Sequence, residues 1–346
     1  MLDIAPLPDR PPPVFSVVIP AFNEAEGLGA FHRRLVSVMQ PLGPWEAIYV
    51  NDGSQDATLL TLFALRGDDP HIGIVNLSRN FGKEIATTAG LDHAVGSVVI
   101  VIDADLQDPP EVIPDMVAAW REGFDTVYAK RRIRSGETWL KRATAAWFYS
   151  LMRHVGRVEL PPNTGDFRLM SRRVVDAVRQ LREQHRFMKG VFAWVGFPSS
   201  AVPYDRAPRH AGTTKWSYWR LWNLALEGIT SFTVMPLKVA TYLGLLVALL
   251  AVIYAAQVVI RTLLFGNAVA GYPSLMTVVL FLGGVQLMTL GVIGEYLGRV
   301  FNETKQRPLY LVEAFEPSNA KASSAVHCHQ SPSVPPHPIP SMLARR

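Results

Sequence analysis

An apolar run that ends in a cluster of acidic side chains constrains the fold of this chain more than any other feature. Residues 98–102 read VVIVI, and Asp103 and Asp105 follow directly. Such a run predicts a strand buried on both faces of a parallel sheet, and ligands bind where such strands end. Because side chains two residues apart share one face of an extended chain, Asp103 and Asp105 predict a seat for Mg²⁺ or Mn²⁺. The group expected on that metal is a phosphate.

Short apolar runs alternate with helical patterns through the first part of the chain. The expected strands are residues 15–19, 47–50, 72–77, 98–102 and 126–129, and helical spacing of apolar residues occurs at 24–39 and 57–65. This alternation predicts an α/β domain with a doubly wound, mostly parallel sheet.

Polar motifs follow the first two expected strands as well. PAFNE occupies residues 20–24 and NDGSQD occupies residues 51–56, so both are expected at the same sheet edge as Asp103. An isolated Asp-x-Asp is more often a solvated turn, but polar strand ends that converge on one edge favour a binding site. The sequence has no Gly-x-Gly-x-x-Gly and no Walker loop, so recognition of a nucleotide is expected to rely on side chains and a metal.

The composition requires a membrane part. The chain is 49% hydrophobic and only 18% charged, which is too apolar for an ordinary soluble protein of 346 residues. Residues 239–260 and 275–294 are each long enough to cross a hydrocarbon core of about 30 Å. Basic residues flank this pair, with Lys238 before it and Arg299 after it, so both ends are expected in the cytoplasm. We therefore predict a two-helix transmembrane hairpin in a multi-pass protein of the inner (cytoplasmic) membrane.

The remaining segments complete a predicted domain organisation. We expect a flexible N-terminus at 1–13, a cytoplasmic catalytic domain at 14–215, an interfacial helix at 216–236, the hairpin at 237–300 and a largely disordered cytoplasmic tail at 301–346. Residues 137–155 have basic, aromatic helical spacing, typical either of a membrane-surface helix or of a core helix. The net charge of +5 is mild and spread along the chain, so nucleic acid is not an expected partner.

Several motifs occur together in a diagnostic order. They are PAFNE at 20–24, NDGSQD at 51–56, SRNFGKE at 78–84, DADLQDPPE at 103–111, GDFRL at 165–169 and RF at 186–187. In this combination the chain resembles the inverting family 2 glycosyltransferases over residues 15–307. The resemblance is to the polyprenyl-phosphate branch, which includes dolichol-phosphate mannosyltransferase and bacterial undecaprenyl-phosphate sugar transferases. It implies a nucleotide-sugar-binding domain of the GT-A type.

The resemblance also implies roles for individual residues. Those expected to line the nucleotide base and ribose are Pro20, Phe22, Glu24 and Asp52. Those expected to hold the metal and diphosphate are Asp103, Asp105 and Gln107. Those expected to neutralise phosphates of donor or acceptor are Arg131, Arg206, Arg209 and Lys215. Arg79 and Lys83 are either further phosphate contacts or partners of nearby acidic residues.

Asp166 occupies the position of the family's catalytic base, and with Asp105 and Arg131 it makes up the expected catalytic set. The acceptor, however, is a phosphate monoester with a second pKa near ~6, so at neutral pH it is already mostly a nucleophilic dianion. Little proton abstraction is needed. We therefore expect Asp166 chiefly to orient the acceptor or an arginine such as Arg168.

The predicted function is metal-dependent, inverting transfer of a sugar from a nucleoside diphosphate sugar to polyprenyl phosphate at the cytoplasmic face of the membrane. This reaction supplies lipid-linked sugar for cell-envelope glycans. A UDP-sugar is favoured over GDP-mannose, and the enzyme is expected to form a homo-oligomer among membrane lipids. A processive polysaccharide synthase is the first alternative, but its Q-x-x-R-W motif is missing from the sequence. An inactive membrane scaffold or lipid-binding protein is the second, and it would not need Asp103, Asp105 and Gln107 together.

Overall fold

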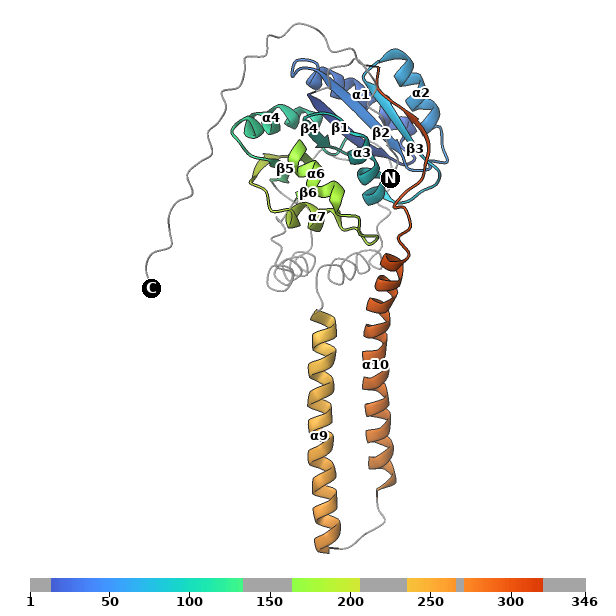
Figure 1. Ribbon diagram of the computed structural model, residues 1–346, viewed down its shortest axis with the longest axis vertical. Coiled ribbons are helices and arrows are strands. Elements are labelled where there is room, and N and C mark those ends of the chain that lie inside the picture. Colours follow the sequence, from blue (N-terminus) through green and yellow to red (C-terminus); the bar gives the residue numbers. More distant parts are fainter. Residues whose placement is uncertain (1–13, 133–163, 206–234, 266–270, 320–346) are drawn as a thin grey trace, which may run out of the picture.

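The computed structural model describes residues 14–132, 164–205, 235–265 and 271–319. These residues form an α/β domain from which two long helices, α9 (Met235–Phe265) and α10 (Tyr272–Thr304), extend side by side (Figure 1). Several predicted segments lie outside the described residues. They are the N-terminus at 1–13, the segment at 137–155, the predicted interfacial helix at 216–236 apart from its last two residues, and the end of the tail from 320.

The domain is built on one mixed sheet. Its strands are β1 (Phe15–Ala21), β2 (Trp45–Asn51), β3 (Ile72–Leu77), β4 (Val98–Val101), β5 (Thr126–Arg131), β6 (Thr164–Ser171), β7 (Ser199–Tyr204) and β8 (Val312–Glu316). They lie in the order β7-β5-β6-β4-β1-β2-β3-β8. Only β6 and β8 run against the others, β6 between β4 and β5 and β8 along β3. The predicted α/β class with a mostly parallel sheet is confirmed.

Helices cover both faces of this sheet. The helices of the domain are α1 (Ala25–Met39), α2 (Thr58–Asp68), α3 (Lys83–His93), α4 (Ile113–Arg121), α6 (Arg172–Gln180) and α7 (Met188–Trp194). Apolar side chains of α1, α2 and α4 pack with Val17 and Ile19 of β1 on one face, and those of α3, α6 and α7 pack with Val18 on the other. The period of two along β1 thus divides the core into two layers.

Gly90 brings α3 unusually close to the sheet. A Cβ built on Gly90 would lie 2.2 Å from Cγ1 of Val18, so only glycine allows this approach. Because α3 follows β3, its first residue, Lys83, is held at the edge of the sheet where the parallel strands end.

Three strands were not predicted from the sequence. β6 and β7 contain polar or proline residues that interrupt an apolar pattern, and β8 lies inside the predicted tail. Within the segment 301–346 that was predicted as the tail, Phe315 pairs with Val75 in the antiparallel β8–β3 ladder. An edge strand of this kind gains its stability from the backbone groups that β3 would otherwise leave unpaired.

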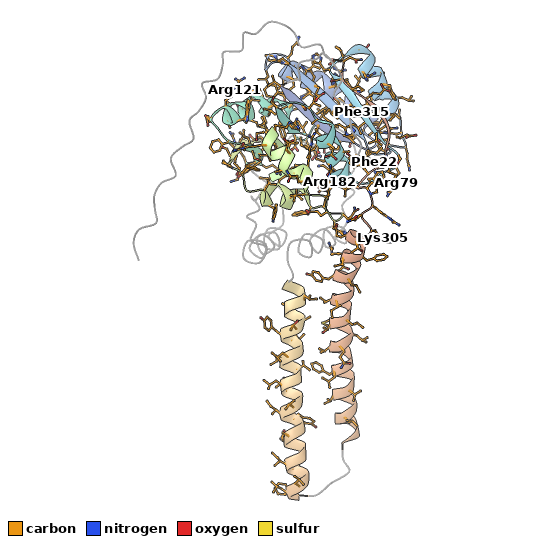
Figure 2. All side chains as sticks on the ribbon, viewed as in Figure 1. Phe22, Arg79, Arg121, Arg182, Lys305 and Phe315 are labelled. Carbon is orange, nitrogen blue, oxygen red and sulfur yellow. The ribbon has the colours of Figure 1, made fainter. Side chains whose placement is uncertain are left out.

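The two long helices agree only in part with the predicted spans. By length and hydropathy, one membrane-spanning candidate is found among the described residues, Phe281–Thr304, and Val239–Tyr254 is a shorter apolar helix. The predicted span at 275–294 overlaps the first of these, and the span at 239–260 overlaps the second. Many large apolar side chains on both helices are exposed (Figure 2). The two-span topology stays a prediction.

Candidate active site

The antiparallel strand β6 brings two distant carboxylates together. Asp103 follows β4, and Asp166 lies near the beginning of β6. Val101 is paired with Arg168 in the β4–β6 ladder, so the residues just after β4 and just before Arg168 share one edge of the sheet. This is also the edge where the PAFNE and NDGSQD motifs follow β1 and β2.

Lys83 joins these carboxylates. Its Nζ lies 2.6 Å from Oδ2 of Asp103 and 2.7 Å from Oδ2 of Asp166. The carboxylate side chains are 24% and 15% exposed, so solvent screens the contacts only partly. Burial alone would raise the pKa of Asp166, but the ammonium of Lys83 and the charge of Lys189 hold it well below its ordinary value. Asp166 is therefore an ionised carboxylate at every physiological pH. Lys83 therefore pairs with nearby acidic residues, and its predicted contact with a phosphate stays a prediction.

Two further charged residues, Glu84 and Arg168, lie near Asp166. Burial and the charge of Asp166 raise the pKa of Glu84 to about 7. Oε2 of Glu84 accepts a hydrogen bond of 3.2 Å from the backbone of Met188, which ties α3 to α7. Arg168 donates to the backbone oxygen of Gly165 at 3.2 Å and lies 3.8 Å above the ring centre of Phe192. The direct partner of the Asp166 carboxylate is therefore Lys83 rather than Arg168, which contacts the backbone oxygen of Asp166.

The PAFNE and NDGSQD loops form one hydrogen-bonded unit. The backbone of Asn23 donates to Oγ of Ser54 at 3.0 Å, and Oδ1 of Asn23 accepts from the backbone of Gln55 at 2.9 Å. Asn23 has a φ of 55°, a left-handed conformation that asparagine tolerates better than most residues. The backbone of Glu24 donates to Thr58 at 2.9 Å. The predicted nucleotide residues of the first loop are thus fixed against the second.

Asp52 has a clear positioning role. It is only 2% exposed, and its two carboxylate oxygens accept from the backbones of Phe81 and Gly82 at 2.7 and 2.9 Å. The next residue, Gly53, has a φ of 62°, and a Cβ there would lie 2.4 Å from the backbone of Arg79. Asp52 therefore holds the loop that precedes Lys83, and its predicted contact with the nucleotide remains a prediction.

The DADLQ turn presents the predicted metal ligands. Oδ1 of Asp105 accepts from the backbone of Gln107 at 3.1 Å, which closes a tight turn around Leu106. Leu106 has a φ of 61° and a buried side chain, an uncommon backbone conformation for leucine. Gln107 is 5% exposed, so its side chain is fixed by packing.

These residues fit a metal ion whose coordination shell is completed by a substrate. No group of three or more His, Cys, Asp or Glu suited to a metal occurs among the described residues. Mg²⁺ is commonly held by one or two carboxylates together with substrate phosphates and water, which matches Asp103 and Asp105. Burial and the charge of Asp166 outweigh Lys83 and raise the pKa of Asp103.

Arg131 completes the charged edge. Its Nε donates to the hydroxyl of Tyr204 at 3.1 Å, and that hydroxyl donates to Asp108. Burial opposes the charged form, but the hydrogen bond to Tyr204 and the charges of Asp108 and Asp103 raise the pKa of Arg131. Asp108 and Tyr204 were not predicted as site residues; Asp108 lies in the DADLQDPPE motif, whereas no sequence signal marks Tyr204. Three predicted phosphate ligands lie outside the described residues: Arg206, Arg209 and Lys215.

The structure is an α/β domain with charged side chains gathered at the carboxyl edge of a mixed sheet, and comparisons with known proteins give its family. Residues 16–179 match Glycosyl transferase family 2, and residues 235–300 match the GtrB C-terminal hairpin. The chain is 57% identical over 298 residues to an uncharacterized glycosyltransferase of Synechocystis sp., which covers 86% of this chain and 94% of the relative. It is 51% identical over 300 residues to the bactoprenol glucosyl transferase of Shigella phage SfV, which covers 86% and 97%. The protein therefore belongs to glycosyl transferase family 2 and is a glycosyltransferase, as its motifs predicted.

The Lys83 bridge makes a prediction about stability. Lys83→Met leaves two partly buried carboxylates facing each other, so the free energy of unfolding at pH 7 should fall by about 1–3 kcal/mol. Without the ammonium, the folded-state pKa of Asp166 rises above its unfolded value. The loss should therefore be largest at neutral pH and shrink as the pH falls toward 5 and below. Thermal unfolding in detergent at pH 7 and pH 5 measures this, with the exposed Lys130→Met as control. An equal loss at both pH values would contradict the assigned role of Lys83.

Proposed function

We propose that this glycosyltransferase moves a sugar from a nucleoside diphosphate sugar, a UDP-sugar rather than GDP-mannose, to a polyprenyl phosphate. The observation that carries the proposal is the charged edge itself, where Asp103 and Asp105 for a metal lie beside Lys83 and Arg131 for phosphates. Relatives named bactoprenol glucosyl transferases support a polyprenyl acceptor.

Each part of the edge has a chemical task in this proposal. A divalent cation on Asp103 and Asp105, with Gln107 beside them, would offset charge on the diphosphate leaving group. Arg131, held by Tyr204 at 3.1 Å, would supply a fixed positive charge on the same side. Fixed charges of this kind lower the barrier because they need no reorganisation when the bond breaks.

The acceptor needs orientation more than deprotonation. A phosphate monoester with a second pKa near ~6 is already ionised at neutral pH, so it can attack the anomeric carbon without a base. Asp166, kept ionised by Lys83, would fix the direction of the Lys83 ammonium, and that ammonium would steady a phosphate. Attack on the face opposite the leaving group inverts the anomeric centre.

The long helices would deliver the lipid. We propose that α9 and α10 form a membrane hairpin, in keeping with the match of residues 235–300 to a C-terminal hairpin. Lys238 at the start of α9 and Arg299 near the end of α10 favour a cytoplasmic position for both ends and hence for the catalytic domain.

The direct test is a transfer assay with the purified protein, undecaprenyl phosphate and a panel of UDP-glucose, UDP-GlcNAc, a UDP-aminoarabinose donor and GDP-mannose. We expect a labelled lipid product and release of nucleoside diphosphate, both lost on chelation of Mg²⁺. Asp105→Asn should lower the rate by roughly a hundredfold or more without changing the circular dichroism spectrum, because it weakens a metal ligand. Exposed Asp115→Asn on α4 is the matched control. Product formation at the parent's rate by Asp105→Asn would refute the metal assignment.

The pH profile separates orientation from base catalysis. Because no proton has to leave an acceptor phosphate that is already ionised, Asp166→Asn should lower the rate by a factor that stays roughly constant from pH 7 to pH 9. Paired rate profiles of parent and variant, with the chemical step shown to be rate-limiting, measure this factor. A defect that disappears at high pH would make Asp166 the catalytic base.

A further inference from the structure

One residue of the edge strand β8 has no pairing partner in the β3–β8 ladder. Asn76 pairs with Ala314 and Leu77 pairs with Val312, so Glu313 has no partner residue on β3. An extra residue of this kind forms a β-bulge, and bulges beside functional sites redirect a side chain. Here the redirected side chain is a carboxylate, and it belongs to the segment that follows α10.

Glu313 ends a chain of hydrogen bonds that begins in the PAFNE loop. Nδ2 of Asn76 donates to Oε2 of Glu313 at 2.9 Å, and Nδ2 of Asn51 donates to Oδ1 of Asn76 at 2.7 Å. The backbone of Ser54 donates to Oδ1 of Asn51 at 3.4 Å, and that of Asn23 donates to Oγ of Ser54 at 3.0 Å. The amides of Asn76 and Asn51 and the backbone N–H of Ser54 all donate in the direction of Glu313, and Asn23 joins the chain through the separate hydroxyl group of Ser54.

Glu313 at one end and the backbone N–H of Ser54 at the other fix the donor-to-acceptor direction of this hydrogen-bond chain. A carboxylate can only accept, so Asn76 must turn its amide nitrogen to Glu313 and its oxygen to Asn51. Asn51 must then turn its oxygen to the backbone N–H of Ser54, which can only donate. Asn51 and Asn76 are 2% and 8% exposed, so water is a poor substitute for either partner. The acceptor oxygen of Glu313 on β8 thus orients the amide of Asn76, and Asn76 together with the Ser54 backbone orients the amide of Asn51.

We propose that Glu313 is a positioning residue for the donor nucleotide, acting through Asn76 and Asn51 on the loop at residues 51–56. This proposal rests on the proposed function, because it assigns the nucleotide to the joined PAFNE and NDGSQD loops. It makes the segment after α10 part of the donor site. The same segment also meets the loop before Lys83, since the backbone of Ser78 donates to that of Leu311 at 3.0 Å.

The test measures UDP binding to the full-length protein by calorimetry in the presence of Mg²⁺, together with KM and kcat. Glu313→Ala should raise the Kd for UDP and the KM for the UDP-sugar by about threefold to tenfold while changing kcat by less than about twofold. Glu313→Gln keeps an acceptor oxygen and should restore most of the affinity. Glu316→Ala is the matched control, because Glu316 is a β8 carboxylate that lies 3.5 Å from Arg66 instead.

A double variant that exchanges the hydrogen-bond donor and acceptor between residues 76 and 313 makes the test sharper. Asn76→Asp alone sets a carboxylate against Glu313 and should weaken UDP binding by about tenfold or more. In the double variant Asn76→Asp with Glu313→Gln, the amide introduced on β8 becomes the donor, and the carboxylate introduced on β3 still accepts from Asn51. The affinity for UDP should therefore return to within about threefold of the parent.

The outcomes distinguish this proposal from the proposed function. Unchanged UDP affinity in Glu313→Ala, an equal loss in Glu316→Ala, or no recovery in the double variant would each overturn the positioning role alone. A parent protein that binds no UDP with Mg²⁺ would overturn the proposed function and this proposal with it.

Discussion

One ammonium group between two carboxylates is the interaction on which the rest of the site depends. Asp103 follows β4 and Asp166 lies near the beginning of β6, and without Lys83 their charges would repel across the edge of the sheet. The contact joins β4, β6 and α3 at the point where parallel strands end. Because ligands of such sheets bind at this edge, we propose that the charges that hold the fold together there also contact the substrate.

The position of Lys83 is set by groups that need not touch a substrate. Asp52 anchors the two residues immediately before it through backbone hydrogen bonds, and Gly90 lets α3 rest directly on β1. Asn23 and Leu106 adopt left-handed backbone conformations in the two loops that line the edge. Such conformations persist only where surrounding contacts impose them, as the hydrogen bonds of Asn23 and the burial of Leu106 do here.

The sequence predicts much of this arrangement, and its failures have physical causes. The strands β1 to β5 were predicted because apolar runs buried on both faces are unambiguous, and the acidic end of β4 followed from them. β6 was missed because Asp166 and Arg168 break its apolar pattern to serve the site. β8 was missed because an edge strand with exposed side chains owes its conformation to β3, not to its own residues. The pairing of Lys83 with both carboxylates depends on the antiparallel direction of β6, which no local pattern encodes.

We propose that this edge binds a divalent metal tightly only together with a nucleoside diphosphate. Titration of Mn²⁺ into the purified protein, followed by the electron paramagnetic resonance signal of the free ion, tests this claim directly. The account predicts weak binding of Mn²⁺ alone and at least about tenfold tighter binding with UDP, because two carboxylates leave most of the coordination shell to phosphate and water. By linkage, UDP should bind more weakly by the same factor once the metal is chelated. Equal Mn²⁺ affinity with and without UDP would contradict the account.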